Sequence, residues 1–218
     1  MGEPLRHIPV KLIAGLISSK PSGFYAAKPF LEKKFGRIDN ESDTFTFSCT
    51  SYYEMEFGRD LKRKFFSFKK LAWLNGSYRV KLYTNSVERK LSEKNSRTID
   101  PERSRRLPHR TNNPSAALRI DGEQGSRRLP RRTTNIDPGY ISPAKLVLFT
   151  TKNRNHRIYI DGGIYAEPEL QFIKKSFRAF PWTYPDYRSA DYIDFFNSVR
   201  SDYLEQVKNY LVRKAHAY

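Results

Sequence analysis

Acids, amides, hydroxyls and basic side chains that can bind a polar ligand or move a proton gather between Asn135 and Tyr187. They stand beside Pro-Gly and Gly-Gly turns and at the ends of short apolar runs, where loops display side chains from a rigid scaffold. No complete catalytic motif accompanies them, so the sequence predicts the place of a site and leaves the reaction open. The candidates are Asn135, Asp137, Tyr140, Lys145, Thr151, Lys152, His156, Arg157, Glu167, Asp186 and Tyr187.

The basic candidates point to an anionic ligand. Lys145, Lys152 and Arg157 can hold anionic oxygens, Lys as a point charge and Arg with two parallel hydrogen bonds. Thr151-Lys152 also echoes the base-reading loop of GTP-binding proteins, but the chain has no Gly-x-x-x-x-Gly-Lys-Ser/Thr phosphate loop, which argues against a classical GTPase. His156 is the candidate proton carrier, although a lone histidine is more often only hydrogen-bonded.

The acidic candidates have two interpretations. Asp137, Glu167 or Asp186 could act as a base or as a ligand of magnesium, with Asn135 and Tyr140 aligning the substrate. Alternatively, an Asp before Pro-Gly often only bonds backbone amides. The sequence does not decide between these roles.

Trp182–Arg188 joins aromatic rings to Asp186 and Arg188 just before a helical pattern. An anchoring corner explains Trp182 and Tyr187 as well as a ligand site does. An ion pair of Asp186 with Arg188 or Arg157 would be structural.

Cysteine and histidine usage excludes two classes of site. Cys49 is the only cysteine and the four histidines are dispersed, so a structural zinc site and an intrachain disulfide are excluded. We therefore expect a cytoplasmic protein. No apolar run is long enough for a signal sequence or a membrane span, so we expect no membrane partner.

The formal net charge is +17, and about half of it lies between Arg89 and Thr133, which includes most of an Arg-rich segment at 92–134. Within it, Ser104–Asn113 is nearly repeated as Ser126–Asn135, with little apolar periodicity. We interpret the segment as a partly duplicated insertion. It is either a solvated loop or an arm for nucleic acid.

The remaining pattern predicts a single α+β domain over 1–218, with a mixed or antiparallel sheet, flanking helices and a long C-terminal helix. The expected strands are 10–17, 45–48 and 65–68, followed by a hairpin over 157–172 with Pro168 at an edge or bulge. The expected helices begin at Pro29, at Asn85 and after Ser189. Residues 135–140 are expected to form a turn, and 144–150 fits either a helix or a strand.

Nine segments resemble the domain-of-unknown-function family 4416 of prokaryotes. The resemblance spans nearly everything outside about 92–134, and it implies no reaction, since the family has none established. The segments are Val10–Ile17, Thr50–Gly58, Lys81–Asn85, Asn135–Tyr140, Lys145–Leu148, Thr151–Lys152, His156–Tyr159, Gly163–Glu167 and Trp182–Arg188.

Together these observations favour a protein that binds a small phosphorylated or nucleotide-like ligand, and they leave open whether it turns that ligand over. The sequence does not identify a cofactor, and magnesium is one candidate. One alternative is a non-catalytic RNA-binding module that uses the basic insertion. Another is a structural subunit of a complex, and the oligomeric state stays open.

Overall fold

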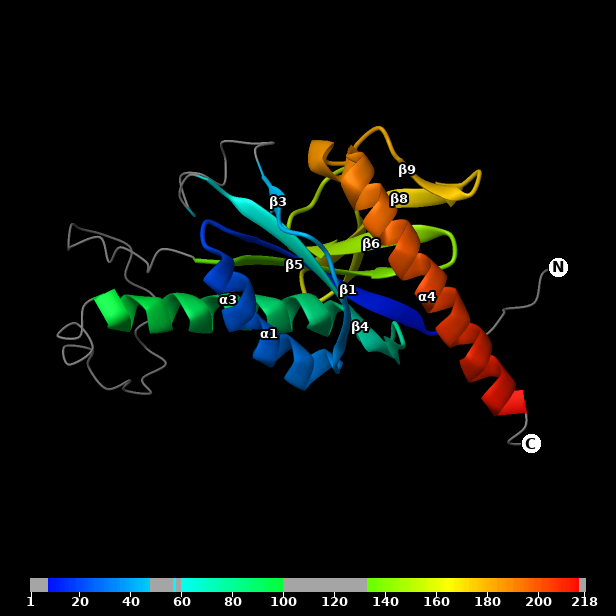
Figure 1. Cartoon of the computed structure of the whole chain (residues 1–218), viewed down its shortest axis with the longest axis horizontal. Coiled ribbons are helices and arrows are strands. Elements are labelled where there is room, and N and C mark those ends of the chain that lie inside the picture. Colours follow the sequence, from blue (N-terminus) through cyan, green and yellow to red (C-terminus); the bar gives the residue numbers. More distant parts are fainter. Residues whose placement is uncertain (1–7, 48–56, 58–59, 100–132, 216–218) are drawn as a thin grey trace.

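The computed structural model describes residues 8–47, 57, 60–99 and 133–215 (Figure 1). Their strands form one nine-stranded sheet with the order β2-β4-β1-β5-β6-β8-β7, while β3 also pairs with β4 and β9 with β8. Every strand pair in this described part is antiparallel. The predicted single α+β domain with a long C-terminal helix is therefore confirmed, and its sheet is antiparallel.

The elements follow one another in this order: β1 (Val10–Ser18), α1 (Pro21–Phe35), β2 (Ile38–Glu41), β3 (Phe45–Thr46), β4 (Lys62–Ala72), α3 (Tyr78–Ile99), β5 (Asn135–Ile141), β6 (Lys145–Thr150), β7 (Ile158–Asp161), β8 (Ile164–Ile173), β9 (Ser176–Ala179), the 3-10 helix η3 (Pro185–Arg188) and α4 (Ala190–Ala215).

β1 lies near the middle of the sheet, and all nine of its residues are buried. Its apolar run has layers on both sides, which explains why it lacks polar alternation. The strand predicted over 10–17 is confirmed. The predictions at 45–48 and 65–68 correspond to β3, which is shorter, and to β4, which is longer.

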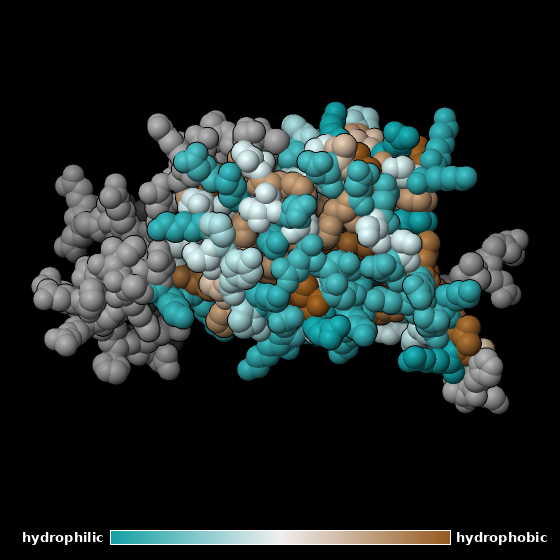
Figure 2. Space-filling model, in the orientation of Figure 1, coloured by the Kyte–Doolittle hydropathy of each residue, from teal (hydrophilic) through white to brown (hydrophobic). Residues whose placement is uncertain are grey.

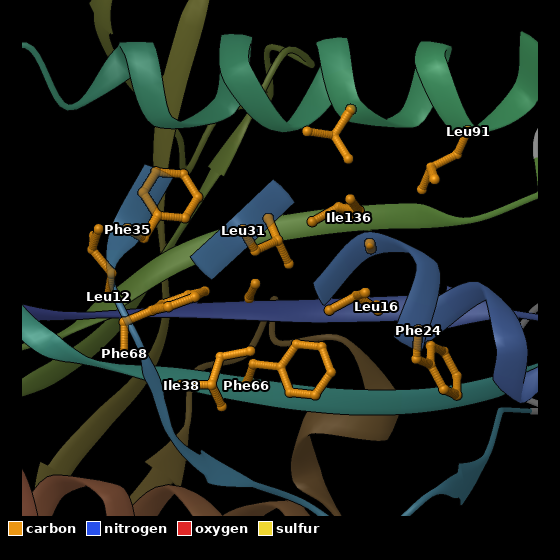
Figure 3. Close-up of a cluster of buried hydrophobic side chains, with 13 residues drawn as sticks. Leu12, Leu16, Phe24, Leu31, Phe35, Ile38, Phe66, Phe68, Leu91 and Ile136 are labelled. Carbon is orange, nitrogen blue, oxygen red and sulfur yellow. The ribbon is translucent and has the colours of Figure 1, made fainter. Parts of the chain in front are cut away.

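The helices cover both faces of the sheet (Figure 1). α1 and α3 pack on one face, where Leu16, Phe24, Leu31 and Phe66 belong to one buried cluster (Figure 3). α4 packs on the other face through Phe196, Val199, Tyr203 and Val207. The helix predicted after Ser189 is confirmed, and the Ser189 hydroxyl accepts a hydrogen bond from Tyr192 N–H at 3.4 Å.

Two predicted helix starts are wrong. α1 begins at Pro21, two turns before Pro29, which lies inside the helix on its exposed side. An interior proline removes one helical hydrogen bond, and water can replace it at an exposed position. α3 begins at Tyr78 rather than Asn85, and the Glu88 carboxylate accepts the Ile136 backbone N–H at 2.7 Å instead of capping the helix.

The turn predicted over 135–140 is also wrong, because these residues belong to β5. β6 pairs only with Gly139, Tyr140 and Ile141, so β5 is unpaired on that side at Pro138, where a strand tolerates proline. Residues 145–150 form the strand β6, which settles the open choice at 144–150.

The hairpin predicted over 157–172 is confirmed as β7 and β8, joined at Gly162 and Gly163 with φ of 57° and 75°. Pro168 lies at a bulge as predicted, because Leu146 pairs with Leu170 and Val147 with Pro168, which leaves Glu169 as the extra residue.

α3 continues to Ile99 and β5 begins at Asn135, so most of the Arg-rich segment, 100–132, lies outside the described residues. Within the described part, no helix is sufficiently long and apolar to cross a membrane.

Candidate functional site

Arg63 of β4 is the centre of a buried polar group on the α4 side of the sheet. It precedes Phe65 by two residues, and strand alternation places both side chains on the same face. Gly15 of the neighbouring β1 leaves room for it, since a Cβ there would lie 3.0 Å from Arg63 Nη1 and 2.8 Å from Phe65 Cε1. The lack of a side chain at Gly15 therefore helps to place the guanidinium.

Three groups from other elements contact this guanidinium. Arg63 Nη2 lies 3.1 Å from Asp186 Oδ2, Nη1 lies 3.6 Å from Asp137 Oδ2, and Nη1 donates to Tyr187 Oη at 3.3 Å. Burial alone would lower the pKa of Arg63, but Tyr187, Asp186 and Asp137 outweigh it and raise that pKa above its ordinary value. Arg63 is therefore a permanent buried cation.

Asp137 has further partners at the unpaired part of β5. Asn135 Nδ2 donates to Asp137 Oδ2 at 2.8 Å, and Lys81 Nζ lies 3.7 Å from Asp137 Oδ1. Lys81 Nζ also donates to the Ile136 carbonyl at 2.8 Å. Asp137 is thus held by two cations and an amide.

Glu167 of β8 fixes the loop that joins β6 to β7. Its Oε1 lies 2.7 Å from His156 Nε2, and its Oε2 lies 2.9 Å from Arg157 Nη2. The side chains of Glu167 and Arg157 are each 3% exposed and that of His156 is 17% exposed. Burial strengthens both charge-assisted contacts, so one carboxylate orders the end of a basic loop.

Arg157 and His156 reach from this loop to the segment before η3. Arg157 Nη2 donates to Tyr184 Oη at 3.1 Å, and Nη1 donates to the Lys152 carbonyl at 2.8 Å. The His156 ring stacks on Trp182 with centroids 5.3 Å apart. The indole of Trp182 donates to the Pro168 carbonyl at 2.8 Å. The rim of the site, formed by the rings of His156, Trp182 and Tyr184, is therefore aromatic and held in place by these contacts.

Glu169 links the two halves of the site. It is fully buried, its Oε1 accepts the Tyr184 backbone N–H at 2.7 Å, and its Oε2 has no hydrogen-bond partner. Burial, helped by the Glu167 and Asp186 charges and opposed by the Tyr184 N–H and Arg63, raises the pKa of Glu169 to about 8. Glu169 is thus neutral near pH 7 and can donate a hydrogen bond.

We call this group the Arg63 cluster, and it comprises Arg63, Asp137, His156, Arg157, Glu167, Glu169, Tyr184, Asp186 and Tyr187. Three of its buried polar atoms have no partner, namely Arg63 Nε, Arg157 Nε and Glu169 Oε2, and a fourth, Asp186 Oδ2, has only its ion pair with Arg63. Burial also raises the pKa of Asp186, although Arg63 opposes the shift. Unsatisfied buried groups with shifted pKa values are typical of functional sites.

The structure brings together seven of the eleven candidates from the sequence: Asn135, Asp137, His156, Arg157, Glu167, Asp186 and Tyr187. Thr151 and Lys152 lie on the exposed part of the loop next to them. Tyr140 and Lys145 lie elsewhere. Tyr140 packs toward the α1–α3 side against Phe149, and Lys145 is exposed at the opposite end of β6 from the loop.

Sequence reasoning missed Arg63, Lys81, Glu169 and Tyr184. Arg63 was hidden in the basic run Lys62-Arg63-Lys64, but its spacing from Phe65 was a usable signal for an inward side chain. Glu169 carried no such signal, because the bulge that turns it inward depends on the register with β6.

Within the described residues, no group of three or more His, Cys, Asp or Glu side chains could hold a metal ion. Among the cluster's acids, Asp186 contacts Arg63, and Glu167 contacts His156 and Arg157.

Comparison with known proteins gave one match. No curated protein and no solved structure matched the chain. The model of the family described as a domain of unknown function (DUF4416) matches residues 8–102 and 115–203, which include every member of the Arg63 cluster. The segment between the two matched parts, 103–114, holds the first copy of the Arg-rich repeat. Since the matched residues make up most of the sequence, the chain belongs to the DUF4416 family.

Proposed function

We propose that the protein binds a small phosphorylated or nucleotide-like ligand at the β6–β7 loop, over the exposed rim of the Arg63 cluster. The observation that carries the proposal is the fixation of this loop by Glu167, which contacts both His156 and Arg157. A loop that is already ordered loses little conformational entropy when it binds a ligand.

The charge of the loop favours an anion. Thr151–Arg157 contains Lys152, Arg154, His156 and Arg157 and no acid. Lys152 and Arg154 are exposed beside the fixed part of the loop. Phosphate oxygens suit such donors, since lysine and arginine form charge-assisted hydrogen bonds with them.

Glu169 is fully buried next to Tyr184, which Arg157 contacts. Its neutral carboxyl adds no negative charge there, whereas an ionised one would repel an anion. His156 is the group we assign to proton movement if the ligand is turned over, because its ring lies at the rim with Nε2 2.7 Å from Glu167 Oε1.

The test is a thermal-shift screen of nucleoside mono-, di- and triphosphates and inorganic phosphate, with and without magnesium, followed by calorimetric titration of each hit. Replacing Arg157 would leave Glu167 buried without its cation, so the informative variant is the double change Lys152→Ala and Arg154→Ala. We expect affinity to fall by at least about tenfold, which corresponds to one lost charge-assisted contact.

The matched control is Lys174→Ala with Lys175→Ala in the β8–β9 turn, which removes two exposed lysines far along β8 from the loop. This pair should leave the affinity unchanged. Hits that bind equally well to both double variants, or the lack of any hit, would contradict the proposal. A cytoplasmic location belongs to the same proposal and rests on the single cysteine, Cys49.

A further inference from the structure

Five exposed basic side chains gather where α1 ends and β2 and β4 meet. Lys33 and Lys34 lie in the last turn of α1, Arg37 follows it, and Lys69 and Lys70 lie near the end of β4. We call them the α1–β4 patch. Hydrophilic side chains predominate over this lower edge of the molecule in Figure 2, where α1 and the end of β4 lie in Figure 1.

Strand pairing brings the five residues close together. Lys69 N–H donates to the Arg37 carbonyl at 2.9 Å, so these two residues lie on neighbouring chains. A Cβ on Gly36 would lie 3.1 Å from Lys70 Cβ, which places Lys70 against the end of α1. Two segments, the end of α1 with Arg37 and the end of β4, thus bring their cations to one edge of the sheet, where Lys69 and Lys70 lie on opposite faces of β4.

No member of this patch forms an ion pair within the described part of the chain. Elsewhere in that part, Lys11, Lys28, Arg63, Lys81 and Arg157 each face an acid. The negative end of the α1 dipole explains two lysines in its last turn. It does not explain Arg37, Lys69 and Lys70, and like charges on neighbouring strands lower stability.

Aromatic rings accompany the cations. Phe30 is 36% exposed and lies on the same helical face as Lys33 and Lys34, at spacings of three and four residues. Lys34 Nζ lies 5.5 Å from the centroid of the Tyr83 ring, so one of the cations already contacts an aromatic ring of α3. An exposed aromatic ring beside cations without an acidic partner is the combination that binds bases and phosphates of single-stranded nucleic acid.

A lipid surface fits less well. A helix that lies on a membrane inserts its apolar face. The apolar face of α1, formed by Phe24, Ala27, Leu31 and Phe35, is buried against the sheet and α3.

We propose that the α1–β4 patch is a binding surface for single-stranded nucleic acid, in which the five cations contact phosphates and Phe30 stacks on bases. This surface is separate from the β6–β7 loop and does not depend on a ligand there. It contains no residue of the Arg-rich segment, so the proposal gives the described part of the chain its own contact with a polyanion.

The experiment measures the affinity of the full chain for a single-stranded RNA oligonucleotide by fluorescence anisotropy across a salt series. The test variant is Lys33→Gln, Lys69→Gln and Lys70→Gln. If three phosphate contacts are lost, the slope of log K against log salt should become shallower by about 2. The control is Lys174→Gln, Lys175→Gln and Arg178→Gln in the β8–β9 hairpin, which has the same change in charge and should keep the slope of the wild type.

Three results would overturn the proposal. The first is an equal change of slope in the test and control variants, which would mean that only net charge matters. The second is a slope that depends on Arg105, Arg106, Arg127 and Arg128 and not on the patch. The third is binding to vesicles with anionic lipid, lost in the test variant, without binding to RNA.

Discussion

Two buried polar networks lie toward the α4 side of the sheet at opposite ends of β1, and they differ in how completely their groups are paired. The Lys11 network comprises Lys11, Asp39, Asn40, Ser67, Asp202 and Gln206. Lys11 is at the start of β1, whereas Arg63 pairs with Ile17 near the end of that strand. Each network buries one cation. The comparison therefore shows how the groups paired with that cation determine whether the network is fully hydrogen-bonded.

The Lys11 network satisfies its groups. Lys11 Nζ donates to Asp39 Oδ2 at 2.5 Å, Gln206 Oε1 at 3.1 Å and the Phe68 carbonyl at 3.2 Å. Ser67 Oγ donates to the other oxygen of Asp39 at 2.7 Å. The ammonium thus has three acceptors for its three protons, and α4 is tied to β1 and β2 through polar contacts.

The pKa values of two acids show the difference. Burial alone would raise the pKa of Asp39, but hydrogen bonds from Lys11 and Ser67 outweigh it and lower that pKa below its ordinary value. At Glu169 the single N–H of Tyr184 cannot offset burial, and the pKa rises to about 8. The complete network is structural, whereas the incomplete one has donors and acceptors left for something else.

The largest effect is expected from Lys11→Met, which keeps the side-chain volume and removes the ammonium. Asp39 would then stay buried without its cation, and breaking a buried pair in this way costs about 3–5 kcal/mol. Urea denaturation at pH 7 measures the loss, with Lys175→Met as the exposed control. A loss below about 1 kcal/mol would show that Asp39 does not need Lys11.

Glu169→Gln should act in the opposite direction and depend on pH. Folded Glu169 keeps its proton up to about pH 8, whereas in the unfolded chain it ionises near its ordinary value of 4.5. The folded state then binds more protons between these values, so the stability of the wild type falls as the pH rises from about 4.5 to about 8. The two pKa values set an upper limit of about 5 kcal/mol on this fall.

Glutamine resembles the neutral carboxyl and cannot ionise, so the variant should lack this fall and be more stable than the wild type at pH 8. Denaturation curves at pH 5, 6.5 and 8 measure the difference. Parallel pH profiles for the two proteins would contradict a proton held by Glu169.

A smaller loss of stability is expected from a change at the partly exposed edge of the Lys11 network. Asp202 Oδ2 accepts a hydrogen bond from Asn40 Nδ2 at 3.1 Å and is partly exposed. Asp202→Ala should cost about 1 kcal/mol, because water can replace this contact. The same denaturation measurement applies, and a cost as large as that of Lys11→Met would show that the network is one cooperative unit.

Sequence patterns predicted those parts of the fold that local spacing determines. The Asp161-Gly162-Gly163 turn fixed the hairpin, because both glycines adopt positive φ, and the periodicity of Phe196, Val199 and Tyr203 fixed α4. β5 was missed because Asp-Pro-Gly is typical of turns. Only the late start of its pairing with β6 lets Pro138 stay in a strand.

The site was predictable only in part for the same reason. Asp137, Glu167 and Asp186 were visible as polar residues among apolar runs, whereas their shared partners were not. Arg63 of β4 and Asp137 of β5 are far apart along the chain, and their contact exists because β4, β1 and β5 are neighbours in the sheet. Such pairings follow from topology, which spacing along the chain does not determine.

The contrast between the two networks is tested most directly by a carbon-13 NMR titration that follows the carboxyl groups of Glu169 and Asp39 in one sample. We expect Glu169 to titrate near pH 8 and Asp39 to titrate below its ordinary value of 3.8. Titration of Glu169 near 4.5, with Asp39 unchanged or higher, would show that both networks are equally well paired and would contradict the account.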